Sequence, residues 1–375
     1  MSDCSPMQIV YVVTSAGQDL YSAMTRVSVA SLRLTNPSVK VVVVCDTETD
    51  RALRAGKDPL LDEVDEWSAF ETPPAPPVFR NRFLKTSLRQ RIEGSYLFLD
   101  SDTIVRDDLA AIFAMPGDMA AAPNHSKEEK AGQIWEGDRR IMDEMNWFPG
   151  LDTYFNGGVL FVRDTQKVKQ FYRLWHQKWE LVHSRLQSYR DQAALNSAIF
   201  ESGIACVVLP HRYNAQVITA IEKAYGAAIW HYYSNSNSNS GNQIDSFIQK
   251  TMATGRVDNH VLNKMVRRAS IWGPDYWKSH SGREVIRQLS QGLTNAIESD
   301  QNMFKYCWQL RQSEMACCRS VLTKAFIDAY WSERKRAHQR LLGIFIRLFP
   351  GEMFKSPARD CLLHAFMGRV KSLLK

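Results

Sequence analysis

Short apolar runs alternate with longer amphipathic stretches along the first 235 residues of the chain. The run Val39–Asp46 is continuously apolar and β-branched, which predicts a strand buried on both faces. Strands are predicted at Gln8–Ser15, Val39–Asp46, Tyr96–Leu99, Met119–Pro123, Phe155–Val162, Cys206–Pro210 and Ala227–His231. Helices are predicted at Ser22–Leu34, Asn81–Gln90, Lys167–Leu186 and Asp191–Glu201. This alternation favours an α/β sheet with helices on both faces.

The pattern changes after the polar segment Ser234–Asn242, whose serine and asparagine repeat is typical of a linker or a loop. Residues 243–375 have helical spacing and no strand pattern. We therefore predict an α/β domain over residues 1–241 and a mainly helical region over residues 242–375. Within the first part, the prolines of Glu71–Pro77 predict an extended loop.

Composition narrows the class of protein. Of the 375 residues, 45% are hydrophobic and 23% are charged, which is typical of a globular protein. No run of 18 apolar residues and no signal-peptide pattern is present, so neither a membrane span nor a cleaved leader is expected. The seven cysteines have no framework spacing and no CxxC pair, which favours reduced thiols in a cytoplasmic protein.

The net charge of +7 comes from residues 331–375, which hold ten Lys or Arg and three Asp or Glu. Two stretches of this tail place apolar residues on one helical face: Ala337, Leu341, Phe345 and Leu348, then Leu362, Phe366, Val370 and Leu373. One interpretation of residues 335–375 is a helix on an anionic membrane surface, at the cytoplasmic face. The other is a helix packed on the main domain with a solvated basic face. No nucleic-acid motif accompanies the tail, so nucleic acid is not an expected partner.

The segment Tyr96–Val105 places two carboxylates, Asp100 and Asp102, directly after a buried strand. Side-chain alternation breaks down at a strand end, so both carboxylates can face the same side. Hard divalent cations bind such oxygen ligands and keep positions open for a diphosphate. Ligands of open α/β sheets bind at the carboxyl ends of strands. The position therefore favours a metal site over the alternative, a pair of solvated turn aspartates.

Five further segments can be compared with known motifs: Thr14–Tyr21, Tyr154–Phe161, Asp191–Asn196, Pro210–Asn214 and Ile229–Tyr233. Asp-Ser-Asp at residues 100–102 resembles the DxD motif of nucleotide-sugar glycosyltransferases with the GT-A fold. The other segments resemble, in order, motifs of glycosyltransferase family 8, the glycogenin and lipopolysaccharide galactosyltransferase type. The resemblance covers about residues 8–235.

The resemblance implies a GT-A fold and a retaining hexosyltransferase. The donor would be a UDP-sugar, with glucose or galactose foremost, and the acceptor a glycan, a lipid-linked glycan or a protein. Asp100, Asp102 and His231 would hold Mn²⁺, with Mg²⁺ as the alternative ion. The metal would stabilise the diphosphate leaving group. The alternative for His231 is a core histidine, and the competing hypothesis for the chain is a catalytically inactive GT-A domain that binds a nucleotide sugar or a partner.

The resemblance also assigns residues to the nucleotide end of the donor site. Tyr21 would pack on the uracil ring, and Asp19 and Thr14 would lie near the ribose and base. Lys85 and Arg82 would reach the donor's phosphate or sugar. The alternatives are ordinary helix-entry packing for Tyr21 and a solvated helix face for the two basic residues.

At the sugar end, the residues that the resemblance implies are Ser101, Asn124, Asn156, Gly157 and Gly158. Asp191 would bind sugar hydroxyls, and Gln192 would lie near the anomeric carbon. The alternatives are a helix cap for Asp191, which is compatible with sugar binding, and a β-bulge or a tight strand start for Asn156 and the glycines.

Two features depart from the family pattern. The family often has an aspartate that touches the sugar where this chain has Asn124, which can form hydrogen bonds but carries no charge. The family also often follows its histidine with Gly-x-x-Lys-Pro-Trp, whose lysine binds the diphosphate. Here His231 is followed by the Ser/Asn segment.

Overall fold

A computed structural model describes residues 7–124, 134–147, 153–217, 224, 226–232, 243–267, 280–299, 304, 307, 311 and 315–351. Contacts divide the chain into two compact units. The first spans residues 1–223, 227–238 and 245–266, and the second spans 224–226, 239–244 and 267–375. The boundary predicted at residue 241 lies outside the described residues and stays a prediction.

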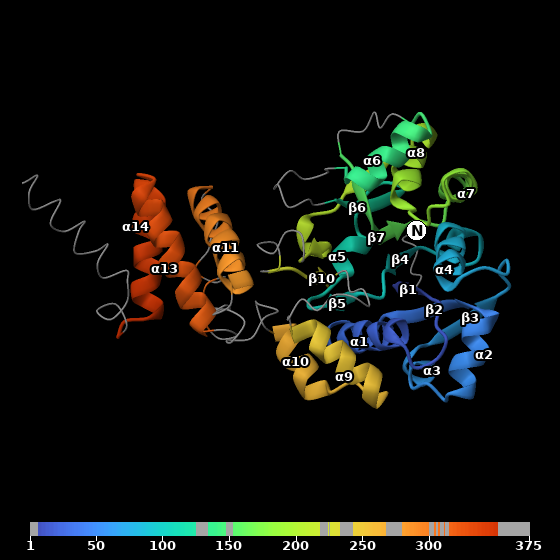
Figure 1. The fold of residues 1–375 in the computed structure, drawn as a ribbon, viewed down its shortest axis with the longest axis horizontal. Coiled ribbons are helices and arrows are strands. Elements are labelled where there is room, and N and C mark those ends of the chain that lie inside the picture. Colours follow the sequence, from blue (N-terminus) through green and yellow to red (C-terminus); the bar gives the residue numbers. More distant parts are fainter. Residues whose placement is uncertain are drawn as a thin grey trace, which may run out of the picture. The chain divides into compact units, whose positions relative to one another are not determined.

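The first unit is built on a seven-stranded mixed sheet with the order β3-β2-β1-β4-β7-β6-β8 (Figure 1). Its strands are β1 (Gln8–Val13), β2 (Lys40–Asp46), β3 (Glu66–Phe70), β4 (Tyr96–Leu99), β6 (Met119–Pro123), β7 (Phe155–Val162) and β8 (Cys206–Val208). β7 is antiparallel to both of its neighbours, whereas the other adjacent pairs are parallel. The amino end of β7 therefore lies at the edge where the neighbouring strands end.

Helices cover both faces of this sheet. They are α1 (Leu20–Thr35), α2 (Thr47–Ala55), α3 (Leu60–Glu63), α4 (Pro77–Thr86), α5 (Ala110–Phe113), α6 (Glu136–Glu144), α7 (Gln166–Leu186) and α8 (Gln192–Ser202). Alternate residues of β1 enter separate cores: Val10 and Val12 pack with α4, α7 and α8, whereas Ile9, Tyr11 and Val13 pack with α1. The predicted α/β fold class is confirmed.

The strands that form the centre of the sheet agree with the sequence prediction, and β4, β6 and β7 agree in both bounds. β3 was not predicted. Its residues alternate between polar and apolar and are only partly buried at the sheet edge, where they pair with β2 on one side. An edge strand of this kind has no apolar run to reveal it.

A second, three-stranded sheet has the order β5-β10-β9. It consists of β5 (Thr103–Val105), β9 (Ala215–Gln216) and β10 (Ile229–His231). β5 follows Asp102 directly and pairs antiparallel with β10, with Thr103 opposite His231. This register brings His231 to the Asp100–Asp102 segment although the two are more than a hundred residues apart in sequence.

Two helices after residue 242 belong mainly to the first unit, α9 (Gln243–Thr254) and α10 (Asn259–Arg267). Side chains near the start of α1 hold the end of α9. Gln18 donates to the carbonyl oxygen of Met252 (2.6 Å), and the buried Arg26 donates to that of Gly255 (2.5 Å). In Figure 1, α9 and α10 lie beside α1.

The second unit is helical, as predicted, with α11 (His280–Glu298), α13 (Met315–Trp331) and α14 (Lys335–Leu348). The predicted apolar face of α14, formed by Ala337, Leu341, Phe345 and Leu348, is buried, and this helix packs against α13 and α11. In the described residues, packing therefore occupies the apolar face that could have entered a membrane. The second apolar repeat of the tail lies outside these residues.

The structure also bears on the expectations about membrane spans and cysteines. None of the helices in the described ranges is long and apolar enough to cross a membrane. The cysteines that the structure describes are free thiols: Cys45, Cys206, Cys307, Cys317 and Cys318.

Candidate active site

The site forms where β4 ends and β7 begins. Leu99 pairs with Val159, and the backbone N–H of Asp100 donates to the carbonyl oxygen of Gly158 at 2.8 Å. Because β7 runs opposite to β4, its first residues lie beside the last residues of β4. The segment Asn156–Gly158 and the two aspartates therefore share one edge of the sheet.

Asp100, Asp102 and His231 offer three ligand atoms that all lie within 4.8 Å of one another. Nε2 of His231 is 3.3 Å from Oδ1 of Asp102 and 4.0 Å from Oδ2 of Asp100. The imidazole is buried, whereas the two carboxylate side chains keep 24% and 19% of their surface exposed. This set of two oxygen donors and one imidazole suits a Mn²⁺ or Mg²⁺ ion that keeps further ligand positions.

The charge state of Asp102 also suits a cation. Burial alone would raise the pKa of this carboxyl. The imidazole of His231, its hydrogen bond to the carboxylate, and the charge of Lys85 outweigh burial and hold the pKa of Asp102 below its ordinary value. A carboxyl that is ionised at neutral pH can act as a metal ligand without first losing a proton.

The two glycines of β7 have different surroundings. A Cβ atom on Gly158 would lie 2.3 Å from Cε1 of His231 and 2.9 Å from Oδ2 of Asp100. A Cβ atom on Gly157 would meet nothing closer than Leu195, at 3.4 Å. Because Gly158 has no side chain, the backbone of β7 can lie directly against His231 and Asp100. Position 157, by contrast, has room for a methyl group.

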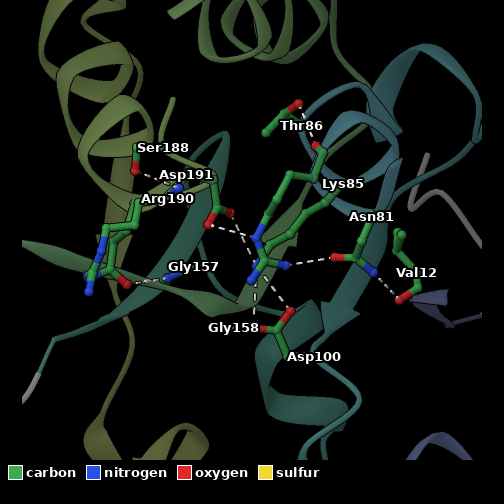
Figure 2. A network of polar contacts seen from close by, with 12 residues as sticks. Val12, Asn81, Lys85, Thr86, Asp100, Gly157, Gly158, Ser188, Arg190 and Asp191 are labelled. Carbon is green, nitrogen blue, oxygen red and sulfur yellow. Dashed lines mark hydrogen bonds and ion pairs between the residues drawn. The ribbon is translucent and has the colours of Figure 1, made fainter. Parts of the chain in front are cut away.

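Two basic residues of α4, Lys85 and Arg82, lie near the same edge, and Figure 2 shows Lys85 beside Asp100 and Asp191. Nζ of Lys85 lies 3.0 Å from Oδ1 of Asp100 and 3.4 Å from Oδ2 of Asp191. Nε of Arg82 lies 3.3 Å from Oδ1 of Asp191, and its guanidinium also donates to Asn81. Lys85 is buried, so the solvated helix face is excluded for this residue.

Asp191 is at the N-cap position of α8, but its side chain makes no capping hydrogen bond. Burial would raise the pKa of Asp191, whereas the charges of Lys85 and Arg82 lower it below the ordinary value. The carboxylate is therefore ionised and lies against both basic residues, of which Figure 2 labels Lys85. Of the two predicted interpretations, the cap is wrong for the side chain, although the residue does begin the helix.

The chain was compared with known protein families and with curated proteins. The sequence profile described as nucleotide-diphospho-sugar transferase matches residues 40–233. The chain belongs to this family. The family match agrees with the predicted GT-A glycosyltransferase class. A search among curated proteins finds no match.

Three solved structures are similar to parts of this transferase. The galactosyltransferase LgtC in complex with donor and acceptor sugar analogs has a TM-score of 0.46 and 17% identity, over 66% of this chain and 96% of that one. The apo form of mouse xyloside xylosyltransferase 1 has a TM-score of 0.43 and 14% identity, over 62% and 99%. The glycosyltransferase GlyE of Streptococcus pneumoniae TIGR4 has a TM-score of 0.44 and 17% identity, over 69% and 63%.

Three residues predicted to lie near the base and ribose, Thr14, Asp19 and Tyr21, lie around the start of α1. Both carboxylate oxygens of Asp19 accept backbone N–H groups, from Ser22 and Ala16 (each 3.0 Å), so this side chain caps α1. Tyr21 is 53% exposed. Thr14 donates its hydroxyl hydrogen to the carbonyl oxygen of Pro77 (3.1 Å), which joins the end of β1 to the start of α4.

Ser101 lies between the two aspartates of the transferase. Its hydroxyl oxygen accepts a hydrogen bond from Thr25 of α1 at 2.9 Å. This bond ties the Asp100–Asp102 segment to the helix that carries Tyr21. The structure thus joins the predicted nucleotide end to the predicted metal ligands, while the contacts of each residue with a donor stay predictions.

Amide side chains make up much of the part that is predicted to bind the sugar. Asn156 donates to Oδ1 of Asn124 (3.3 Å) and to Oε1 of Gln192 (3.1 Å). Asn124 is buried, and its backbone N–H donates to the carbonyl oxygen of Tyr154. The asparagine that replaces the family's aspartate is therefore a hydrogen-bond partner of Asn156.

Two residues of this cluster, Asp138 and Asn214, were not among the site residues predicted from the sequence. Asp138 of α6 is buried and accepts hydrogen bonds from Arg190 and Gln192, each at 3.3 Å. Asn214 is buried against His231 and Asn156. The Pro210–Asn214 motif gave a signal for Asn214. No sequence signal pointed to Asp138, because α6 itself was not predicted.

Proposed function

We propose that this transferase moves a hexose from a UDP-sugar, with glucose or galactose foremost, to a glycan, lipid-linked or protein acceptor. Mn²⁺, with Mg²⁺ as the alternative, would be held by Asp100, Asp102 and His231. The observation that carries the proposal is this three-ligand cluster beside the buried Lys85. A divalent cation bound there would neutralise the diphosphate as it leaves.

The basic pair of α4 is suited to a donor that carries negative charge. Lys85 and Arg82 come from adjacent turns of one helix and meet the carboxylate of Asp191. The guanidinium offers several N–H donors to phosphate or sugar oxygens. The ionised Asp191 can only accept hydrogen bonds, so its partners on a donor would be sugar hydroxyls.

Retention of the anomeric configuration is part of the proposal. Asp191 is held in ion pairs by two cationic side chains, which lowers its strength as a nucleophile. We therefore favour transfer on one face of the sugar. The bond from the anomeric carbon to the phosphate oxygen breaks, the bond to the acceptor oxygen forms on the same face, and the departing phosphate takes the acceptor's hydroxyl proton.

Calorimetric titration tests the proposal. UDP and a panel of UDP-sugars are titrated with and without Mn²⁺, and release of UDP is then followed over time. Mn²⁺-dependent binding with slow UDP release supports an active transferase and identifies its sugar. Binding without release, even with acceptors present, favours the inactive nucleotide-sugar-binding domain. No binding of any UDP-sugar contradicts the proposal.

The acceptor side of the proposal includes an anionic membrane surface at the cytoplasmic face. Lys335 and Arg336, at the start of α14, are exposed in the structure. Because the apolar face of α14 is packed inside the protein, the described residues of this helix would bind a membrane mainly through the attraction of their positive charges to anionic lipids. A lipid-linked acceptor would be presented at such a surface.

A further inference from the structure

A chain of side-chain hydrogen bonds connects His231 to the buried carboxylate of Asp138. Its members in order are His231, Asn214, Asn156, Gln192 and Asp138. Nδ1 of the imidazole is 3.0 Å from Oδ1 of Asn214. Asn214 donates to Asn156 (2.9 Å), Asn156 donates to Gln192 (3.1 Å), and Gln192 donates to Asp138 (3.3 Å).

Backbone groups determine the direction of this chain. The N–H of Gly158 donates to Oδ1 of Asn156 at 2.9 Å, and the N–H of Gly157 donates to Oε1 of Gln192 at 3.3 Å. A backbone N–H can only donate, so the atoms it meets must be the amide oxygens. The oxygen and nitrogen positions of both amides are therefore assigned independently of the histidine.

The orientation of Asn214 follows from that of Asn156. Because Oδ1 of Asn156 is an acceptor, Asn214 must present its NH₂ group there, and its own oxygen then faces His231. An amide oxygen cannot donate, so Nδ1 of His231 carries a hydrogen. In the imidazolium form Nε2 also carries a hydrogen and donates it to Asp102, 3.3 Å away, whereas in the neutral form the lone pair is then on Nε2.

We propose that Asn214 is a positioning residue that keeps the proton of His231 on Nδ1 and so presents Nε2 to a divalent cation. The metal half of this inference rests on the proposed function, whereas the proton assignment does not. A partner at the second ring nitrogen orients a ligating histidine and raises its basicity. Asn214 is 0% and His231 2% exposed, so bulk water is poorly placed to replace the amide.

Mn²⁺ calorimetry on the full chain, without donor, tests the metal half. Asn214→Ala should weaken Mn²⁺ binding by about 10- to 100-fold, the usual effect of losing such a partner. The matched control is Asn36→Ala. Asn36 is also buried, and its amide bridges α1 to the carbonyl oxygen of Asp107 and the N–H of Leu109. The control should lose stability and keep its Mn²⁺ affinity.

Equal Mn²⁺ affinity in wild type and Asn214→Ala would overturn the positioning role. An equal loss in Asn36→Ala would also overturn it, because general destabilisation would then explain the effect. A wild-type protein that binds no Mn²⁺ would instead contradict the proposed metal site, and the proton assignment would be decided by the second measurement.

The second measurement is ¹⁵N NMR of the histidine-labelled, metal-free wild type at a pH where the imidazole is neutral. The His231 signals are identified by their absence in His231→Gln. We expect a protonated Nδ1 and an unprotonated Nε2. A proton on Nε2 would overturn the inference whatever the calorimetry shows. This readout needs no substitution at Asn214, so a variant that failed to fold would not affect it.

Discussion

Gly158 and His231 approach each other so closely that a methyl group on the glycine would lie 2.3 Å from Cε1 and 2.8 Å from Nδ1 of the imidazole. The glycine belongs to β7 of the large sheet, and the histidine belongs to β10 of the small one. The proposed metal site therefore lies where the two sheets meet without an intervening side chain.

Gly158→Ala should displace His231 and weaken Mn²⁺ binding by about 10-fold or more, in the range expected for a disturbed ligand. Calorimetric titration of Mn²⁺ measures the effect. Gly157→Ala is the matched control, since its new methyl group would have an ordinary contact distance to Leu195. If both variants bound Mn²⁺ as the wild type does, the close approach would have no bearing on the metal.

Asp102→Asn should abolish Mn²⁺-dependent binding of the donor, because a neutral amide is a much weaker ligand than a carboxylate. The protein should stay folded, which circular dichroism and thermal unfolding would show. Donor titration and UDP release report the functional loss. Full turnover in this variant would mean that the metal assignment is wrong.

Lys85→Met should destabilise the protein by about 3 kcal/mol, the lower end of the range for a broken buried pair, because Asp100 loses its lysine partner while Asp191 keeps Arg82. Adding Asp191→Asn should recover part of this loss, with a coupling of about 0.5–3 kcal/mol. Urea unfolding of both single variants and the double variant measures it. Strict additivity would indicate that the 3.4 Å contact between Lys85 and Asp191 contributes no net stability.

The acid stability of the protein should depend on Asp191. Its pKa in the folded protein lies below the ordinary aspartate value, because Lys85 and Arg82 outweigh burial. The folded state therefore gains stability above the ordinary pKa and loses it as the pH falls through the depressed one. Asp191→Asn should flatten this part of the curve of unfolding free energy against pH.

Asp138→Asn is a control whose expected effect on acid stability is opposite to that of Asp191→Asn. Burial raises the pKa of Asp138, so its contribution is present at low pH and is lost as the pH rises through the folded-state pKa. Replacing it should steepen the acid loss of stability. Identical curves for wild type and both variants would contradict the assigned charge states.

Reversing two charges tests the membrane surface more cleanly than removing the tail, because truncation would remove α14 and expose the surfaces of α11 and α13 on which it packs. Lys335→Glu with Arg336→Glu changes only exposed residues at the helix start, where acidic residues favour the helix dipole. Each basic residue near an anionic surface contributes about 1 kcal/mol. We expect sedimentation with anionic vesicles to fall sharply, and unchanged sedimentation would exclude this surface.

Much of the sheet was predictable because its strands are buried on both faces. β4 and β6 are apolar runs bounded by polar residues, and β7 ends in the apolar run Val159–Val162; the predicted bounds of all three agree with the structure. β5 has only three residues and directly follows the turn that carries Asp100 and Asp102, so its pairing with β10 had no local signal. Short strands of this kind are stabilised by their partners and not by their own composition.

The sequence alone determined which residues are the candidate metal ligands, because Asp100, Asp102 and His231 belong to motifs in a recognisable order, and their ligand atoms do lie within 4.8 Å of one another. Only the tertiary structure decided how acidic residues with similar local positions are used. Asp19 and Asp191 both occupy a helix N-cap, yet only Asp19 caps its helix. Capping is a short-range preference, whereas the ion pairs of Asp191 require the fold to bring Lys85 and Arg82 of α4 to the start of α8.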